Sequence, residues 1–384
     1  MLKDTKRTIV ATAQLIGAII GVGVFGVPYA LSKIGPVLGL VYFVVLGGIQ
    51  LLQHLFFAEA AIACPTKLRL AGLAERYIGR GAKHIAATST IFGYWAALLA
   101  YIVVGGMFLH VLLSPFIGGH VFTYQVAWAL VGGLIVYFGL DIVSRVGFIA
   151  TTGLVLTMLA LIGIGVPNIW PDSFLHGTIT DFVLPYGVIL FSLSGLPAIL
   201  EMEDILKGKH KHYRLAVIIG SVVATVLTAA FGYVVWGVTG GAITQDAVAG
   251  LRFFLGDQVA TLAAAFGFLA VSTSFFATAI NLQSTIQYDY NTKKFAAWVL
   301  TIGMPFGFFL SGAQNFISII GFSGAVFGGI TAVLVAVLYI EVTKKKLLKE
   351  HALGVPLSFA YLSILILSTG AVYEIWTSAS HLLK

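Results

Sequence analysis

GVGVFGVP, residues 21–28, is the stretch of sequence that decides the fold of this chain. It lies inside an apolar segment, residues 8–33, that is long enough to cross a bilayer core about 30 Å thick. Its glycines let the backbone leave helical geometry, and Pro28 removes an amide donor and clashes with the preceding turn. Non-helical backbone at membrane depth is tolerated only where it is buried in protein or lines a cavity. The stretch therefore predicts a transmembrane helix that is interrupted near its middle.

A second apolar segment, residues 181–206, carries a similar interruption. Phe191 is followed by Gly-Leu-Pro at residues 195–197, just as Phe25 is followed by Gly-Val-Pro. One such break could be a kink without a purpose. These two lie five spans apart, so their helices cross the membrane in opposite directions. Interrupted segments at matching positions of two oppositely oriented halves indicate an inverted-repeat transporter with a site near the midplane.

The whole chain has the composition of a membrane protein. It is 59% hydrophobic and 10% charged over 384 residues, with a mean hydropathy of +1.00, whereas soluble domains carry roughly 25% charged residues. Because charge is scarce along its entire length, we expect one membrane domain and no soluble module. The only cysteine, Cys64, excludes a disulfide framework and a cysteine-based metal site.

Segments of about 20 apolar residues mark the predicted membrane spans. Eleven are found, at residues 8–33, 36–61, 83–115, 121–140, 143–166, 181–206, 213–238, 259–287, 295–312, 316–341 and 355–377. The fold expected is all-α, with residues 8–166 and 181–341 as two inverted repeats of five helices each. Residues 355–377 then add an eleventh helix to a single transport domain that covers residues 1–384.

The distribution of positive charge predicts the orientation. With the N-terminus inside, the segments on that side hold 19 of the 22 Lys and Arg residues, and only Lys33, Arg252 and Lys384 fall elsewhere. The positive-inside rule predicts this asymmetry for the cytoplasmic side. We therefore expect a protein of the prokaryotic cytoplasmic membrane with its N-terminus in the cytoplasm and its C-terminus outside. The net charge of +7 is then a topology signal, and no nucleic-acid partner is expected because the basic residues lie in short loops against lipid.

Several motifs resemble one transporter family. Residues 21–30, GVGVFGVPYA, are similar to the first-helix signature of the amino acid/auxin permease family, G-x-G-(apolar)-x-x-x-P-Y-A. AYIVVG at residues 100–105 and FSLSG at 191–195 resemble its third and sixth helices. TSFF at residues 273–276, with Tyr-Asp-Tyr further on, resembles helix 8 of the bacterial aromatic amino acid permease branch. The resemblance implies a LeuT-type fold of the amino acid-polyamine-organocation superfamily, carrying amino acids coupled to Na⁺ or H⁺.

The two interruptions could bind an amino acid zwitterion without any charged side chain. Amides freed in the first break, helped by a half-helix dipole, can hold a carboxylate, and the Tyr101 hydroxyl could donate to the same group. Carbonyls freed in the second break can accept from the ammonium group. Tyr101 reads equally well as a packed or interfacial aromatic. The predicted substrate-binding residues are Gly21, Gly23, Phe25, Gly26, Tyr101, Phe191, Ser192, Ser194, Gly195 and Phe275.

The expected substrate is a neutral amino acid with an apolar or aromatic side chain. No Asp, Glu, Lys or Arg lies at the predicted centre of the first, third, sixth, eighth or tenth span, so a charged substrate side chain would be unpaired there. Five aromatic residues could line an apolar pocket, although each also reads as a core or lipid-facing residue. They are Phe25, Trp95, Phe191, Phe275 and Phe276.

A sodium site is predicted beside the first break. Hard cations prefer oxygen ligands, and Ser272 and Thr273 place two hydroxyls in the middle of the eighth span. The resemblance to the LeuT-type pattern places the carbonyls of Gly17 and Ile20 opposite them, with the Leu269 carbonyl as a fifth ligand. The alternative is that both hydroxyls bond to carbonyls of their own helix.

Proton coupling is the other possibility. The fifth span lacks the Lys that the proton-coupled variant of the fold places where sodium would lie, which favours Na⁺. His54 and Glu59 in the second span, or Glu201, Glu203 and Asp204 in the sixth, could carry a proton instead. His54 also reads as a buried, hydrogen-bonded histidine, and the acidic residues of the sixth span as a solvated cluster or an inner gate.

The function expected is therefore symport of a neutral amino acid into the cell by alternating access. An uncoupled exchanger or a channel is the alternative. Apart from a bound Na⁺, no cofactor is expected; the partners would be the substrate, the coupling ion and membrane lipid, with the protein as a monomer. An enzyme is not expected, because Ser194 has no predicted catalytic partner. The histidines that follow it lie in loops or at the terminus, namely His210, His212, His351 and His381.

Overall fold

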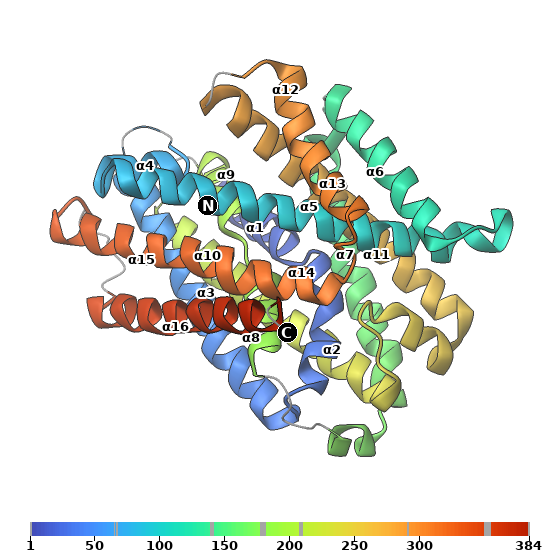
Figure 1. Ribbon diagram of the computed structural model, residues 1–384. Helices are drawn as coiled ribbons and strands as arrows, with labels where there is room; N and C mark the ends of the chain where they lie inside the picture. Colours follow the sequence, from blue (N-terminus) through green and yellow to red (C-terminus); the bar gives the residue numbers. More distant parts are fainter. Residues whose placement is uncertain are drawn as a thin grey trace.

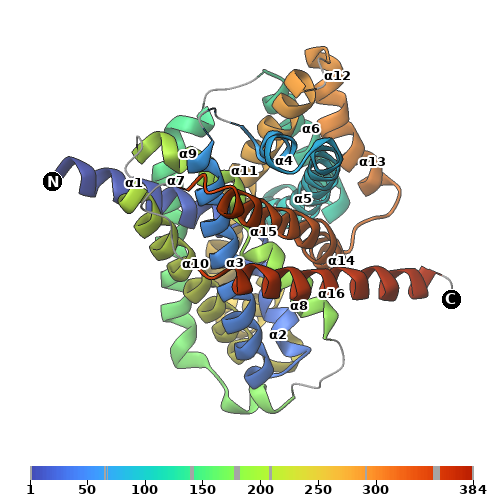
Figure 2. The same ribbon diagram turned by 90° about the vertical axis from the view of Figure 1, so that its left-hand side faces the viewer.

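The computed structural model describes residues 2–64, 66, 68–138, 142–176, 182–206, 210–289, 292–348 and 355–382. Within these ranges all regular structure is helical and no β-strand is present. The prediction of an all-α membrane protein is thus confirmed. The helices pack as one bundle, and the two chain ends project from opposite sides of it in Figure 2.

The first half of the chain contains seven α-helices and three short 3-10 helices in the described residues. They are α1 (Leu2–Ile19), η1 (Val22–Gly26), α2 (Val27–Ser32), α3 (Pro36–Ala63), α4 (Leu70–Tyr77), α5 (Arg80–Ile117), α6 (Val121–Phe138), α7 (Ile142–Gly165), η2 (Val166–Asn168) and η3 (Pro171–His176).

The second half contains α8 (Val183–Ser192), α9 (Leu196–Leu206), α10 (His210–Thr239), η4 (Gly240–Ala242), α11 (Val248–Asp289), α12 (Lys294–Trp298), η5 (Val299–Gly303), α13 (Met304–Leu310), α14 (Phe316–Phe322), η6 (Ser323–Gly328), α15 (Gly329–Lys344) and α16 (Leu357–Leu382). The two elements η5 and η6 are π-helical turns inside longer helices. Gly256, at φ 85°, breaks α11 near its start, because this backbone conformation is easily reached only without a side chain.

The number of membrane spans differs from the predicted eleven. Among the described residues, eight helical segments are each long and apolar enough to cross a membrane, and the bent pair at the N-terminus makes a ninth. The predicted fifth and ninth spans coincide with two shorter apolar helices, Thr152–Asn168 and Lys294–Leu310. Length and composition by themselves therefore support eight or nine spans.

Both predicted interruptions are present as breaks in regular helix. The first helix bends by 48° between its two parts. In the second, α8 ends at Ser192 and α9 begins at Leu196, although the segment Val183–Leu206 still has the length and composition of one span. Pro28 and Pro197 each occupy the second position of the helix that follows the break, where the missing amide of a proline costs no helical hydrogen bond.

The two interrupted helices pack against each other. The 3-10 helix η1 contacts α8, α1 contacts α9, and α3 and α10 pack beside them. On another side, α5 and α11 form the most extensive helix pair of the bundle. The last helix, α16, lies along α15 in Figure 1 and reaches beyond the other helices in Figure 2. The bundle thus brings the two breaks together and leaves α16 at an edge.

Candidate functional site

The backbone of the first break has lost its helical hydrogen bonds. The amide of Gly21 donates to the Ile19 carbonyl at 2.8 Å, and that of Val24 donates to the Gly21 carbonyl at 3.3 Å. In a continuous helix these amides would instead bond to the carbonyls of Gly17 and Ile20. The break therefore releases the two carbonyls for which an ion-binding role is predicted.

The same break leaves two amides without a backbone acceptor. In the described part of the chain, no carbonyl accepts from the amide of Val22 or Gly23. Both residues are buried, and an unpaired buried amide costs about as much as a lost hydrogen bond. Adjacent N–H groups at the start of a helical turn are also the usual partners of an anionic oxygen. A carboxylate placed here would satisfy both amides.

The second break provides carbonyl oxygens. Leu193 has no helical donor for its carbonyl, because Pro197 occupies the position from which that donor would come. The Ser194 amide donates to the Phe191 carbonyl at 3.3 Å. The Ser192 hydroxyl donates to the Val188 carbonyl at 2.7 Å. Among the described residues no group donates to the carbonyls of Ser192, Leu193 or Ser194, so these three can accept from an ammonium group. Leu193 is the one of them that the sequence analysis did not single out.

Glycines bring the two breaks into direct contact. A Cβ atom on Gly23 would lie 2.6 Å from the Ser192 Oγ atom and 2.7 Å from its Cα atom. A Cβ atom on Gly26 would lie 2.6 Å from Ile320 Cδ1, whereas one on Gly21 would meet the Ser274 Oγ atom at 3.4 Å. Gly21 thus faces α11, while Gly23 requires the absence of a side chain so that α8 can approach.

The three phenylalanines predicted to bind substrate differ in how accessible their side chains are. Phe25 is completely buried and contacts the rings of Phe108 and Phe266 at centroid distances of 4.8 and 5.6 Å. Phe275 is also completely buried and packs on Trp128 at 5.3 Å. Phe191 is half-buried and lies next to Gly23. Phe25 and Phe275 therefore form packed core around the site rather than an open pocket wall.

A group of hydroxyls lies beside the first break. The Tyr101 hydroxyl of α5 lies near the Ser274 and Thr278 side chains of α11, and Ser274 is the α11 side chain nearest to Gly21. Sequence analysis identified Tyr101 but missed Ser274 and Thr278. Their spacing with Asn281, at i, i+4 and i+7, is a polar stripe on one helix face that could have indicated them.

The residues of the predicted sodium site are arranged differently from the expected pattern. Ser272 donates to the Phe268 carbonyl at 2.6 Å, and Thr273 donates to the Leu269 and Ala270 carbonyls at 3.1 and 3.0 Å. Both hydroxyls thus bond within their own helix, which is the alternative considered from the sequence. The Leu269 side chain is 42% exposed.

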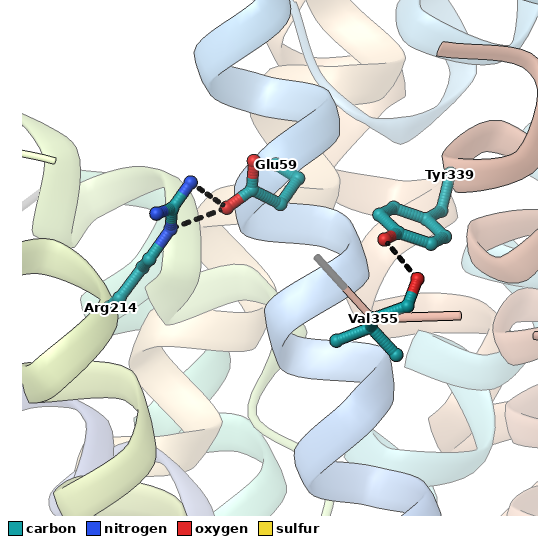
Figure 3. A network of polar contacts seen from close by, with 4 residues as sticks. All are labelled: Glu59, Arg214, Tyr339 and Val355. Carbon is teal, nitrogen blue, oxygen red and sulfur yellow. Dashed lines mark hydrogen bonds and ion pairs between the residues drawn. The ribbon is translucent and has the colours of Figure 1, made fainter. Parts of the chain in front are cut away.

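Two acidic residues that the sequence suggested as proton carriers, Glu59 and Glu201, have side-chain partners. The Oε1 atom of Glu59 on α3 accepts a hydrogen bond from Arg214 Nε of α10 at 2.6 Å and lies 2.6 Å from Arg214 Nη2 in the same ion pair. Figure 3 shows the two side chains pointing toward each other. The Glu59 carboxylate is almost fully buried. On α9, Glu201 is exposed and accepts from the Gln14 side chain at 2.6 Å. Glu59 therefore acts as half of an ion pair, whereas Glu201 faces solvent beside α1.

His54 is the candidate that the structure places directly at a break. Its Nε2 atom accepts the amide hydrogen of Gly195 at 3.1 Å, and its Nδ1 atom lies 2.9 Å from the Ser221 hydroxyl. One turn earlier on α3, the Gln50 side chain donates to the Leu190 carbonyl at 2.9 Å. The amide of Gly195, one of the predicted substrate-binding residues, is thus already occupied by a protein acceptor.

Exposure differs between the two ends of the site. The described residues from Ile20 to Pro28 are all buried, as are those from Pro185 to Leu190. By contrast, Ala18, Ser194, Pro197 and Glu201 are exposed. Side chains around the breaks are therefore buried on the side of α2 and exposed on the side of the N-terminus.

An apolar helical bundle in which two interrupted helices meet, with freed amides on one and freed carbonyls on the other, is the architecture of a membrane transporter for small zwitterions. Comparison with known proteins agrees. The chain matches the tryptophan/tyrosine permease family over residues 4–377, and it belongs to that family. It is also 23% identical to tyrosine-specific transport system 1 of Haemophilus influenzae (strain ATCC 51907 / DSM 11121 / KW20 / Rd) over 353 residues, which cover 86% of each chain.

Family membership confirms two predictions and narrows a third. The resemblance to bacterial aromatic amino acid permeases is confirmed, and so is the prediction of a transporter rather than an enzyme. The substrate class narrows from neutral amino acids with an apolar or aromatic side chain to aromatic ones. The protein is an integral membrane permease for aromatic amino acids.

Proposed function

We propose that this permease is a secondary active transporter that imports tyrosine or tryptophan by alternating access and binds the zwitterion between its two helix breaks. The observation that carries the proposal is the pair of buried amides at Val22 and Gly23, which have no backbone acceptor in the described residues. The substrate carboxylate would accept from them. The ammonium group would then donate to the Leu193 carbonyl across the Gly23–Ser192 contact.

The aromatic side chain of the substrate would lie between Phe191 and the hydroxyls of α5 and α11. Phe191 is the predicted site phenylalanine that is not fully buried. Tyr101, Ser274 and Thr278 could hydrogen-bond a phenol hydroxyl or an indole N–H. A site of this kind, with apolar walls and a few convergent polar groups, suits a ring that carries one polar atom.

The architecture proposed is two inverted repeats of five spans plus α16, with eleven spans, a cytoplasmic N-terminus and a monomeric protein. Its support is that all eleven predicted segments fall on helices in the described residues. The exposure of Ala18 and Ser194 on the N-terminal side then corresponds to an inward-facing state. In that state substrate exchanges with the cytoplasm while the outer halves of both broken helices remain packed.

The coupling ion proposed is Na⁺, with H⁺ as the alternative. The released carbonyls of Gly17 and Ile20 support a cation next to the substrate carboxylate. Ser272 and Thr273 would have to exchange their bonds to their own helix for bonds to the ion.

Uptake into proteoliposomes tests the proposal. Purified protein is reconstituted, and labelled tyrosine, tryptophan, phenylalanine, leucine and lysine are supplied under an imposed Na⁺ gradient, an imposed proton gradient or neither. We expect saturable accumulation of tyrosine or tryptophan driven by one of the two gradients. Equilibration without accumulation under every gradient would indicate the uncoupled exchanger or channel instead.

The double substitution Ser272→Ala and Thr273→Ala belongs to the same experiment. If these hydroxyls bind Na⁺, the variant loses Na⁺-driven accumulation but retains counterflow of substrate. A variant with unchanged Na⁺ dependence would show that the ion binds elsewhere.

A further inference from the structure

The second break differs from the first because another helix supplies partners for its backbone. In a continuous helix the Leu190 carbonyl would accept from the Ser194 amide, and the Phe191 carbonyl from the Gly195 amide. Here the Leu190 carbonyl accepts instead from Gln50 at 2.9 Å, and the Gly195 amide donates to His54 at 3.1 Å. Each side of the break has therefore gained one side-chain partner.

Both partners come from one face of α3. Gln50 and His54 are four residues apart, and side chains at this spacing lie on the same side of a helix. They are 7% and 1% exposed, so water does not compete for their bonds. Each side chain has the chemistry that its backbone partner needs. The Gln50 side chain donates an N–H to the Leu190 carbonyl, and the His54 imidazole nitrogen accepts from the Gly195 backbone N–H.

The hydrogen bonds also determine the form of His54. Because its Nε2 atom accepts from Gly195, the ring must be neutral with its proton on Nδ1. That proton is directed at the Ser221 hydroxyl of α10, 2.9 Å away. The imidazole is thus oriented from both sides, by α10 and by the broken helix.

We propose that Gln50 and His54 form a clamp that holds the second break open, as positioning residues that keep the Leu193 carbonyl directed at the substrate ammonium group. Without the clamp, the Leu190 carbonyl and the Ser194 amide could pair and rewind the helix. Within the described residues, the amides of Val22 and Gly23 in the first break have no such partner. The first break is therefore left for the carboxylate, whereas the second is preorganised before substrate arrives.

This inference rests on the proposed site, and kinetics in proteoliposomes test it. We expect His54→Leu and Gln50→Leu each to raise the KM for tyrosine or tryptophan on the order of tenfold, because each removes one of the two hydrogen bonds that hold the break open. His54→Gln, whose side-chain oxygen can accept near the Nε2 position, should recover most of the affinity. The maximal rate should change less than the KM in all three variants.

The matched control is Gln53→Leu. Gln53 is buried on the same helix, but its side chain donates to Ser363 of α16 at 3.3 Å and not to the broken helix. The Gln53→Leu variant should have the same KM as the unmodified protein. The clamp is refuted if His54→Leu and Gln50→Leu keep the normal KM, or if Gln53→Leu raises it equally.

A second measurement needs no transported substrate and therefore separates the clamp from the proposed function. In a Cys64→Ser background, the substitution Ser194→Cys places one thiol in the break, where Ser194 is exposed. Rewinding of the helix should slow its labelling by a maleimide when His54→Leu or Gln50→Leu is added, but not when Gln53→Leu is added. Equal labelling rates in all four proteins would overturn the clamp even if aromatic amino acids are transported. Slowed labelling in a protein that transports none would leave the clamp standing and reject the proposed function.

Discussion

Gly23 is the residue at which the two interrupted helices come closest. A side chain there would approach both the hydroxyl and the backbone of Ser192 within 2.7 Å, so it could be accommodated only if η1 and α8 moved apart. Such a movement would separate the amides that are proposed to bind the carboxylate from the carbonyl proposed to bind the ammonium group. The size of a single residue therefore controls the spacing of the site.

We predict that Gly23→Ala lowers the affinity for aromatic amino acids on the order of tenfold or more, as overpacking of a tight contact commonly costs about 1–3 kcal/mol. Binding to the purified protein, measured by scintillation proximity with labelled tyrosine, provides the readout. The control is Gly48→Ala on α3, where a Cβ atom would meet nothing within 4 Å. Unchanged affinity in Gly23→Ala would mean that the substrate does not use this contact.

At the scale of elements, the ion pair between Glu59 and Arg214 joins α3 to α10. The Glu59 side chain is 2% exposed and that of Arg214 is 16% exposed. Attraction between the two charges offsets the cost of removing them from water, and loss of one partner leaves the other uncompensated. Because α3 also carries Gln50 and His54, the pair fixes the helix on which the clamp is mounted.

Glu59→Gln should accordingly lower the free energy of unfolding by about 3 kcal/mol, seen as a lower Tm in detergent. Adding Arg214→Leu should restore much of the loss, since no unpaired charge then remains. Glu75→Gln serves as the control, because its ion pair with Lys83 is exposed and exposed pairs contribute little. A Tm that is unaffected by Glu59→Gln would show that the pair does not hold α3 against α10.

At the scale of the whole molecule, exposure is asymmetric about the breaks. The segment from Ile20 to Pro28 is buried, whereas Ala18, Ser194 and Glu201 are exposed on the N-terminal side. This is the asymmetry expected of the proposed inward-facing state with the proposed cytoplasmic N-terminus. A ligand can shift such an equilibrium only by binding one state better than the other.

We therefore predict that Ser194→Cys, in a Cys64→Ser background, reacts with a membrane-impermeant maleimide in inverted membrane vesicles and not in right-side-out cells. Saturating tyrosine should slow the reaction, because the bound zwitterion covers the break. Val37 lies at the start of α3, just after α2, and is 77% exposed. A cysteine introduced there should react with the maleimide from the opposite side of the membrane. Labelling of Ser194→Cys only from outside the cell would contradict either the cytoplasmic position of the N-terminus or the inward-facing state.

The features that the sequence predicted correctly depend on local backbone chemistry and on total composition. The glycines and prolines at residues 21–28 and 195–197 favour an interruption through their own backbone chemistry, and the scarcity of charge indicates a membrane before any packing is known. The resemblance in the first helix indicated the family for the same reason, since its signature is this backbone motif.

The features that only the tertiary structure decided depend on which helices face each other. Phe25 and Phe275 became packed core, and Ser274 is the α11 side chain nearest to Gly21. Ser272 and Thr273 bond within their own helix. The partners of His54 come from the second break and from α10, 141 and 167 residues away along the chain. In an apolar bundle nearly every helix face is hydrophobic, so periodicity carries little information about neighbours. The partners of the few polar groups are set by packing, because each must find a hydrogen bond where water is absent.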